Sequence, residues 1–327
     1  MSASAARASL DECERARSMQ HGRRQLIARG FSVRGLGVQG LSACGLGVQS
    51  YLSRAALRIF VLVGMAVSVA PAFGEPAGRI IDLTHAFDSE TIYWPTEEGF
   101  VLEKGAEGVV EQGYYYAAHR FRMAEHGGTH IDAPIHFYAD GWTVDEIPLD
   151  RLVGPAVLVD VSDRCARDAD HRASVADFEA WEKQHGRIPA GSIVLIRTGF
   201  GRFWPDRKAY LGTDERGAPA VAKLHFPGLH PNAARWLIAE RKINAVGVDT
   251  ASIDHGPSKQ FETHRVLFEA NVPAFENLAA LDELPASGFS VVALPIKIRG
   301  GSGGPLRAIA ILPDVSAGSS AFAPASD

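Results

Sequence analysis

Side chains of the kinds that bind divalent metal ions crowd into the stretch HGGTHIDAPIHF, which begins at His126 and ends at Phe137. In an extended segment, side chains two residues apart point the same way. We therefore expect His130, Asp132 and His136 on one face, toward a cleft, and the alternate apolar residues, Phe137 among them, on the other face, toward the core. Two glycines follow His126, and their turn lets the chain fold back and bring this imidazole to the same cleft.

Two imidazoles and one carboxylate form a ligand set for a borderline divalent ion such as Zn²⁺ or Mn²⁺. In this stretch His126, His130 and Asp132 supply the three groups, and the remaining coordination positions stay open for water, as in a catalytic site. Burying so many polar groups without a cation would cost on the order of 1–3 kcal/mol for each unsatisfied group. Isolated histidines elsewhere in the chain are interpreted as ordinary structural or surface residues.

Two glycine-rich stretches match known catalytic or binding patterns without the context that those patterns need. GLGVQG, which starts at Gly35, has dinucleotide-binding spacing, but no strand precedes it and no helix follows. GGSGG places Ser302 in a nucleophile-elbow pattern, but Pro305 and another strand-like run follow where an elbow needs a helix. The last histidine, His264, also precedes this serine, against the order in α/β-hydrolases. We interpret GGSGG as a glycine hairpin turn.

The charge distribution separates the first 58 residues from the rest of the chain. Residues 1–58 carry a formal charge of +6 and the remainder −11, within a net charge of −5 over 327 residues. Nucleic-acid binders present a basic face to phosphates, so the acidic body excludes that class. Of the three cysteines only Cys165 falls in the body, which excludes an intrachain disulfide framework there.

Residues 59–74, IFVLVGMAVSVAPAFG, predict a targeting segment. A basic flank, a short apolar run and small residues near its end are typical of a secretory signal peptide, and the run is too short for a stable membrane span. Residues 1–58 are then a disordered leader or the result of a start codon placed too far upstream, and residues 316–327 a disordered tail. We expect a periplasmic or secreted protein, or a cytoplasmic one if the apolar run is instead a buried helix.

Between these ends, residues 78–315 alternate apolar strands with helices and predict one α/β domain. Strands are expected at 156–162, 192–199, 244–250, 272–278, 290–298 and 306–312, which are rich in Val, Ile and Leu. One helix is expected over 174–186, with Ser174 as N-cap, and another over 230–242, with Pro231 in its first turn. Near-continuous apolar strands separated by helices favour a sheet covered on both faces.

The motif at 126–137 resembles the His-x-Gly-Thr-His-x-Asp-x-Pro-x-His-Phe signature of the metal-dependent cyclase-like hydrolase family, which includes bacterial kynurenine formamidases and isatin hydrolases. Further blocks extend the resemblance over most of the body, namely IDLTHAFDSETIYWP, GVDTASID, THRVLFEANVPAFENL and LPIKIRGGSGGPLRAIAIL. The ending PIHF is closer to the formamidases than to isatin hydrolases whose signature ends in His-His-Trp. The resemblance implies a swivelling β/β/α fold with a mixed sheet flanked by helices, a homodimer, and hydrolysis of an amide-type C–N bond.

The resemblance also implies a role for single residues. His126, His130 and Asp132 match the ligands of a first metal ion. Asp132 would bridge to a second ion, which His264 and Glu276, twelve residues apart, would complete. One or two ions, Zn²⁺ or Mn²⁺, are therefore expected in each chain.

His136 matches the proton donor and acceptor of the family, and we expect a pKa near neutrality for it. A divalent ion lowers the pKa of bound water from about 15.7 toward 7, so that hydroxide attacks a formamide or cyclic amide carbonyl while His136 protonates the leaving nitrogen. Trp94 matches a substrate-contacting aromatic residue. One of Tyr114, Tyr115 and Tyr116 is expected to add a flat apolar wall for an aryl substrate.

Two other functions compete with amide hydrolysis. The same metal site would serve a cyclase, a lyase or a lactone hydrolase, since each of these also polarises a carbonyl group. A non-catalytic exported metal-binding protein would keep the ligands, but mere binding needs no proton shuttle, and the intact His136 argues against it. In the favoured interpretation the partner is a small aryl amide or cyclic amide.

Overall fold

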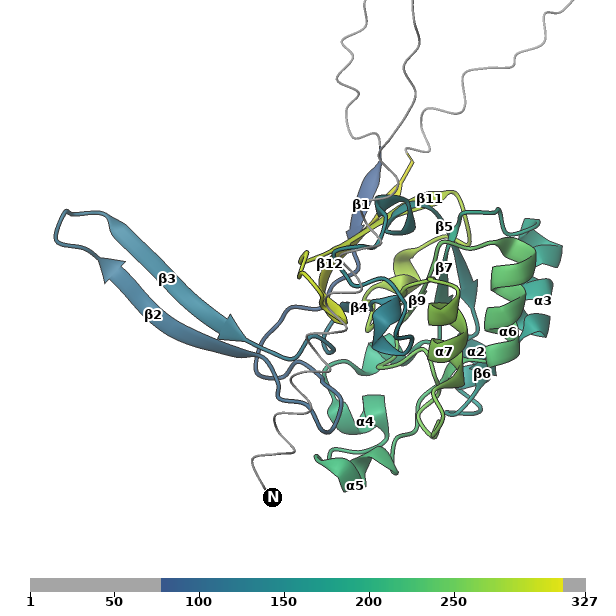
Figure 1. Cartoon of the computed structure of the whole chain (residues 1–327), viewed down its shortest axis with the longest axis horizontal. Coiled ribbons are helices and arrows are strands. Elements are labelled where there is room, and N and C mark those ends of the chain that lie inside the picture. Colours follow the sequence, from purple (N-terminus) through teal and green to yellow (C-terminus); the bar gives the residue numbers. More distant parts are fainter. Residues whose placement is uncertain (1–77, 314–327) are drawn as a thin grey trace, which may run out of the picture. The chain divides into compact units, whose positions relative to one another are not determined.

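The computed structural model describes residues 78–313, and a mixed β-sheet is the central element of this part of the chain (Figure 1). The predicted leader (1–58), signal peptide (59–74) and tail (316–327) lie outside the described residues and stay predictions. Among the described residues, no helix combines the length and the apolar character needed to cross a bilayer.

The secondary structure alternates short strands and helices along the chain. The strands are β1 (Arg79–Asp82), β2 (Val101–Val109), β3 (Tyr115–Arg122), β4 (His130–Asp132), β5 (Val153–Asp160), β6 (Arg172–Ala173), β7 (Ile193–Arg197), β8 (Gly228–Leu229), β9 (Ala245–Val248), β10 (Ala274–Glu276), β11 (Phe289–Pro295) and β12 (Gly303–Leu312). The α-helices are α2 (Ser162–Cys165), α3 (Val175–His185), α4 (Arg207–Leu211), α5 (Ala218–Val221), α6 (Pro231–Trp236) and α7 (Glu262–Glu269). Short 3-10 turns are η1 (Pro134–His136), η2 (Leu149–Arg151), η3 (Phe200–Phe203) and η5 (Leu281–Glu283), and η4 (Leu237–Arg241) is a π-helical turn. All six predicted strands are present, with shifted ends.

The large sheet closes on itself through the pairing of β4 with β12. Its hydrogen-bonded order is β1-β12-β11-β5-β7-β9-β10-β4, and β12 also pairs with β4. The pairs β5–β7, β7–β9 and β9–β10 are parallel, whereas the pairs made by β11, β12 and β4 are antiparallel. The strands from β12 round to β4 therefore form a ring, and the chain has the mixed α/β fold that the sequence predicted.

The alternating side chains of these strands enter two separate cores. Val157 and Val194 face outward and pack with Phe178 of α3 and Phe268 of α7, which lie with α6 on the same side of the sheet (Figure 1). Leu158, Leu195 and the other alternate residues face the ring interior. The sheet was expected to be covered on both faces. The inner face is covered by the opposite strands of the ring, because the sheet closes on itself.

Both predicted helices form, each for a local reason. Ser174 caps α3, since its backbone N–H donates to Asp177 Oδ2 at 2.7 Å, and Gly186 ends the helix with φ of 86°. Pro231 occupies the first turn of α6, and the helix continues as the wider turn η4. At its end Arg241 is buried and donates to both carboxylate oxygens of Glu182 on α3, at 2.6 and 2.7 Å.

Strands β2 and β3 form a separate antiparallel ribbon that projects away from the sheet (Figure 1). Every residue of β3 is exposed, and those of β2 are exposed or half-buried. A few residues after β3 the chain reaches His126. The ribbon is therefore rooted beside the predicted metal ligands.

Candidate metal centre

Long-range strand pairing places the motif inside the sheet. In the pairing of β4 with β10, His130 lies opposite Glu276. In the pairing of β4 with β12, Asp132 lies opposite Gly303. Helix α7 supplies His264, which is buried like His130 and Asp132. Ligand-type residues far apart in the sequence thus meet at one short strand.

The glycines after His126 turn the chain as predicted. Gly127 has φ of 152° and Gly128 φ of 59°, conformations that side chains with a β-carbon rarely adopt. A β-carbon at Gly127 would lie 2.0 Å from a ring carbon of Tyr93, so the turn also needs the missing side chain. The imidazole of His126 consequently lies with its ring centre 5.4 Å from that of His130.

The extended part of the motif is shorter than predicted. Strand β4 ends at Asp132, and η1 follows with Pro134 in its first turn. The ring of Phe137 lies 4.7 Å from that of His264 and lines the cavity, instead of packing with Ile131 in the ring interior. Phe137 does pack against the outer core, but the predicted face shared with Ile131 was wrong, because a 3-10 turn breaks the two-residue period of a strand.

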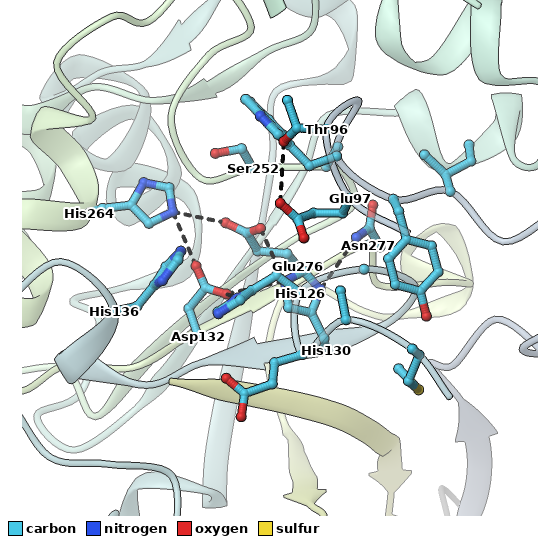
Figure 2. A pocket seen from close by; sticks show the side chains of 18 of the residues that line it. Thr96, Glu97, His126, His130, Asp132, His136, Ser252, His264, Glu276 and Asn277 are labelled. Carbon is cyan, nitrogen blue, oxygen red and sulfur yellow. Dashed lines mark hydrogen bonds and ion pairs between the residues drawn. The ribbon is translucent and has the colours of Figure 1, made fainter. Parts of the chain in front are cut away.

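Five ligand-type side chains gather in two groups that share Asp132 (Figure 2). One group is His126, His130 and Asp132, the other is Asp132, His264 and Glu276, and within each the ligand atoms lie within 4.8 Å of one another. Asp132 Oδ1 lies 2.7 Å from His126 Nδ1 and 3.1 Å from His130 Nε2. Asp132 Oδ2 lies 3.1 Å from His264 Nε2. The structure thus brings together all five residues implied as metal ligands.

The outward nitrogens of two of these imidazoles have buried acceptors. His130 Nδ1 donates to the carbonyl of Gly128 at 2.9 Å, and His264 Nδ1 donates to Asp254 Oδ2 at 2.6 Å. A neutral histidine that donates from one nitrogen keeps a lone pair on the other. In both rings that second nitrogen, Nε2, faces Asp132. The orientation suits metal ligation, in which such outer hydrogen bonds hold the ring.

Burial and mutual charge shift the pKa values in the cluster. Burial raises the pKa of Glu276, and the charge of Asp132 raises it further. Burial also acts to raise the pKa of Asp132, but the charge of His126 and its hydrogen bond hold that pKa well below the ordinary value. Burial lowers the pKa of His264, but its hydrogen bonds to Asp132, Asp254 and Glu276 outweigh this and raise it well above the ordinary value. The two buried carboxylates thus favour a positive charge next to them, either a proton on a histidine or a bound cation.

This donor set fits a divalent cation. Carboxylate oxygens only accept hydrogen bonds, and so do the inward nitrogens of neutral imidazoles. His264 Nε2 lies 3.1 Å from Asp132 Oδ2 and 3.3 Å from Glu276 Oε1, and acceptors this close repel unless a proton or a cation lies among them. Imidazole and carboxylate groups suit Zn²⁺ and Mn²⁺. The residues present can therefore hold such an ion in place of protons.

His136 lies beside the two ligand groups and belongs to neither (Figure 2). Its ring stacks on that of His126, with centres 3.8 Å apart and planes 19° apart, and it lines the cavity. Burial lowers the pKa of His136 to about 4, against the opposing charge of Asp132 and with the help of the neighbouring histidines. The expectation of a near-neutral pKa was wrong because the half-buried ring loses part of its hydration, which disfavours its charged form. A neutral His136 accepts a proton before it donates one.

A cavity of about 650 Å³ opens from these groups and has aromatic walls. Trp94, implied as a substrate contact, is half-buried in the wall, and its ring centre lies 6.2 Å from that of Phe261. Tyr114, Tyr115 and Tyr116 lie at the exposed end of the β2–β3 ribbon, and none of them lines this cavity. The expected tyrosine wall was therefore wrong for the described chain, since the tyrosines belong to a ribbon that leaves the sheet.

Sequence reasoning missed several residues that hold the ligands. Asp254 accepts hydrogen bonds from the ring and the backbone N–H of His264. Ser302 had been considered only as a nucleophile, yet its Oγ lies 2.9 Å from His126 Nε2. No local spacing signals either contact, because each depends on how distant strands and loops pack.

Comparison with known proteins agrees with this geometry. Residues 81–255 match the family model Cyclase, described as "Putative cyclase". The match includes the motif at 126–137, while His264 and Glu276 lie beyond it.

Individual relatives are hydrolases. The chain is 35% identical to an isatin hydrolase of Roseibium aggregatum over 210 residues, which covers 62% of this chain and 77% of that protein. It is 27% identical to a kynurenine formamidase of Salinibacter ruber over 233 residues, 70% of this chain and 96% of the relative. A solved structure of isatin hydrolase A from Labrenzia aggregata, bound to benzyl benzoate, superposes with a TM-score of 0.65 at 35% identity, covering 72% of this chain and 94% of that chain.

Proposed function

This chain belongs to the Cyclase family, and we propose that it uses a divalent metal ion to hydrolyse the amide bond of an aryl formamide or of a cyclic aryl amide. It is a metal-dependent hydrolase that acts on C–N bonds other than peptide bonds, like the relatives above. The observation that carries the proposal is the pair of ligand groups sharing Asp132 at one end of an aromatic-walled cavity.

Zn²⁺ or Mn²⁺ would be held by His126, His130 and Asp132, and a second ion by Asp132, His264 and Glu276. When bound, such an ion polarises a carbonyl oxygen and lowers the pKa of water toward 7. Metal analysis of protein purified without chelators measures both the identity and the number of ions. We expect between one and two equivalents of Zn²⁺ or Mn²⁺ per chain.

The protein's own groups supply positioning and proton transfer. His136 is neutral and faces the cavity, so it accepts a proton from the attacking water and returns it to the leaving nitrogen. Trp94 and Phe261 offer flat apolar surfaces to an aryl ring. The cavity is also lined by the acidic side chains of Glu97, which is labelled in Figure 2, and Glu125.

Turnover of a defined panel tests the proposal. The full-length protein is loaded with Mn²⁺ or Zn²⁺ and incubated with N-formylkynurenine, formanilide, isatin and an aryl lactone, and products are identified by mass. We expect release of formate from a formanilide or opening of the isatin ring with addition of one water. The variant Asp132→Asn should abolish turnover, because Asp132 belongs to both ligand groups. The exposed control Asp163→Asn should not change it.

Other results from the panel would contradict the proposal. Hydrolysis of the lactone alone would replace amide hydrolysis by ester hydrolysis. A product formed without addition of water would indicate a lyase or a cyclase. Metal binding without conversion of any compound would favour the non-catalytic alternative.

A second copy of this chain is the partner that we propose for the β2–β3 ribbon. A two-stranded ribbon is at best marginally stable alone in water. This one exposes the apolar side chains of Leu102, Phe121 and Val109, and the exposed fraction of Val109 is 75%. It also carries charges of both signs, such as Glu107 and Arg120, which a self-complementary twofold interface can pair. The homodimer implied by the resemblance would bury this surface.

Light scattering coupled to size exclusion tests the homodimer. Wild-type protein should elute as a dimer, and Val109→Glu on the ribbon should shift it toward a monomer. Leu149→Glu is the matched control, because Leu149 is equally exposed and apolar on η2. A monomeric wild-type protein, or equal effects of both substitutions, would contradict the proposal.

Export also remains a proposal. It is supported by the apolar segment at 59–74 with its basic flank. Cell fractionation and N-terminal sequencing of the mature protein test it. We expect cleavage near residue 74, whereas an intact N-terminus in the cytoplasm would contradict export.

A further inference from the structure

The structure places Glu125 and Ser302 in a chain of hydrogen bonds behind His126, and we propose that they are positioning residues for this ligand. They keep a proton on its Nε2, so that Nδ1 is the nitrogen that a metal ion can take as a ligand atom. The inference rests on the proposed function in one respect only, namely that His126 binds a metal ion.

The first link joins the imidazole to the serine. His126 Nε2 lies 2.9 Å from Ser302 Oγ, and on the other side of the ring Nδ1 lies 2.7 Å from Asp132 Oδ1. One ring nitrogen therefore points to the serine and the other to the carboxylate shared by both ligand groups. Which nitrogen carries the proton decides whether Nδ1 can serve as a ligand atom.

The second contact, between Ser302 and Glu125, decides which group donates in each of these hydrogen bonds. Glu125 Oε2 accepts from Ser302 Oγ at 2.6 Å and from Ser302 N at 3.0 Å. A carboxylate offers no proton, so the hydroxyl proton of Ser302 points to Glu125 and the oxygen keeps its lone pairs for His126. His126 must then donate from Nε2, and Nδ1 is the nitrogen that faces Asp132. The 2.7 Å contact between Nδ1 and Asp132 Oδ1 is a hydrogen bond, whose proton a bound ion would replace.

Two glycines make room for this arrangement. A β-carbon at Gly303 would lie 2.6 Å from Cε1 of His126, and one at Gly301 would lie 2.9 Å from Oε1 of Glu125. The carbonyl of Ser302 accepts from Ala133 N at 2.9 Å, which ties the serine to the end of β4. The stretch GGSGG thus places a hydroxyl between a carboxylate and an imidazole, and its glycines let the backbone lie against both.

In the other two imidazoles of the cluster, too, the nitrogen that points away from Asp132 has a hydrogen-bond acceptor, although there this nitrogen is Nδ1 and not Nε2. His130 donates to a backbone carbonyl and His264 to the carboxylate of Asp254. Outer partners of this kind typically change metal affinity 10- to 100-fold when removed. His126 is half-buried, whereas the other two are buried, so it depends more on a specific partner to hold its ring.

The test uses the full-length protein in two measurements that need no substrate. The first is nitrogen-15 NMR of the histidine rings in the metal-free protein, which reports which ring nitrogens of His126 carry protons and, in particular, whether Nε2 does. The second is calorimetric titration with MnCl₂ and ZnCl₂. The variants are Ser302→Ala, Ser302→Thr, which keeps the hydroxyl, and Glu125→Gln, whose amide donates as well as accepts. The matched control is Ser290→Ala on the exposed side of β11.

We expect Ser302→Ala and Glu125→Gln to lower the fraction of His126 rings that carry a proton on Nε2 and to weaken binding of the ion about 10- to 100-fold. Ser302→Thr and Ser290→Ala should keep the wild-type protonation of Nε2 and the wild-type affinity. Should Ser302→Ala fail to fold, Glu125→Gln carries the test. Wild-type affinity and wild-type protonation of Nε2 in Ser302→Ala or Glu125→Gln overturn the proposal, as does a wild-type protein that binds neither ion. If binding weakens as expected in a protein that hydrolyses no amide, this proposal stands and only the proposed function fails.

Discussion

Replacing His136 with phenylalanine is expected to separate proton transfer from metal binding. His136 belongs to neither ligand group, but its ring stacks on the ligand His126 with centres 3.8 Å apart. Phenylalanine keeps a flat ring in this position and removes both nitrogens. Alanine would remove the stack as well, at a cost of about 0.5–1.5 kcal/mol, and would thus mix the two effects.

The expected loss of activity follows from the role of the imidazole. A positioned acid–base group contributes roughly a hundred- to ten-thousand-fold to the rate. At about 1.36 kcal/mol for each factor of ten, the variant loses about 3–5 kcal/mol of transition-state stabilisation. The metal affinity should change by less than about threefold, that is by less than about 0.7 kcal/mol.

Steady-state kinetics on the substrate found in the panel, together with calorimetric titration of Mn²⁺, measure both quantities in the same preparation. His185→Phe is the matched control, because His185 is exposed at the end of α3. In His136→Phe we expect kcat to fall while the metal content stays unchanged. If the affinity for metal falls in parallel with kcat, His136 is a ligand and the reasoning is refuted.

Three further predictions concern stability and the ligand shell. Burial lowers the pKa of His85 to about 4, so the neutral ring contributes stability above the unfolded-state pKa of about 6.5 that is lost as the pH falls through about 4. In urea unfolding, His85 should account for a fall of up to about 3 kcal/mol in the free energy of unfolding of the wild type between about pH 7 and about pH 4. His85→Phe should remove this part of the fall, and an unchanged pH dependence would contradict the assignment. Asp254→Asn should weaken metal binding by about 10- to 100-fold, because the hydrogen bond that orients His264 is altered, and an unchanged calorimetric affinity would rule out that role. Gly127→Ala should destabilise the fold by about 2–6 kcal/mol in thermal unfolding, since its β-carbon would overlap the ring of Tyr93 and its φ is unfavourable for alanine; a melting temperature equal to that of the wild type would be inconsistent with the turn described here.

The sequence by itself determined the first ligand group. His126, His130 and Asp132 lie within seven residues, so one glycine turn and one short strand are enough to bring them close to one another. The apolar strands and the capped helix after Ser174 were equally local, because hydrophobic period and capping act over a few residues. These features appear in the structure as expected.

Only the tertiary structure decided how the rest of the site is built. His264 and Glu276 had been assigned through family resemblance, and they reach Asp132 because α7 packs against η1, the turn that follows β4, and because β10 pairs with β4. Closure of the ring through β12 brings Ser302 to His126. Pairing of strands that lie far apart in the sequence depends on the packing of the whole sheet, and the spacing of residues within a short segment does not predict it. The low pKa of His136 has the same origin, since it reflects burial by residues from several elements.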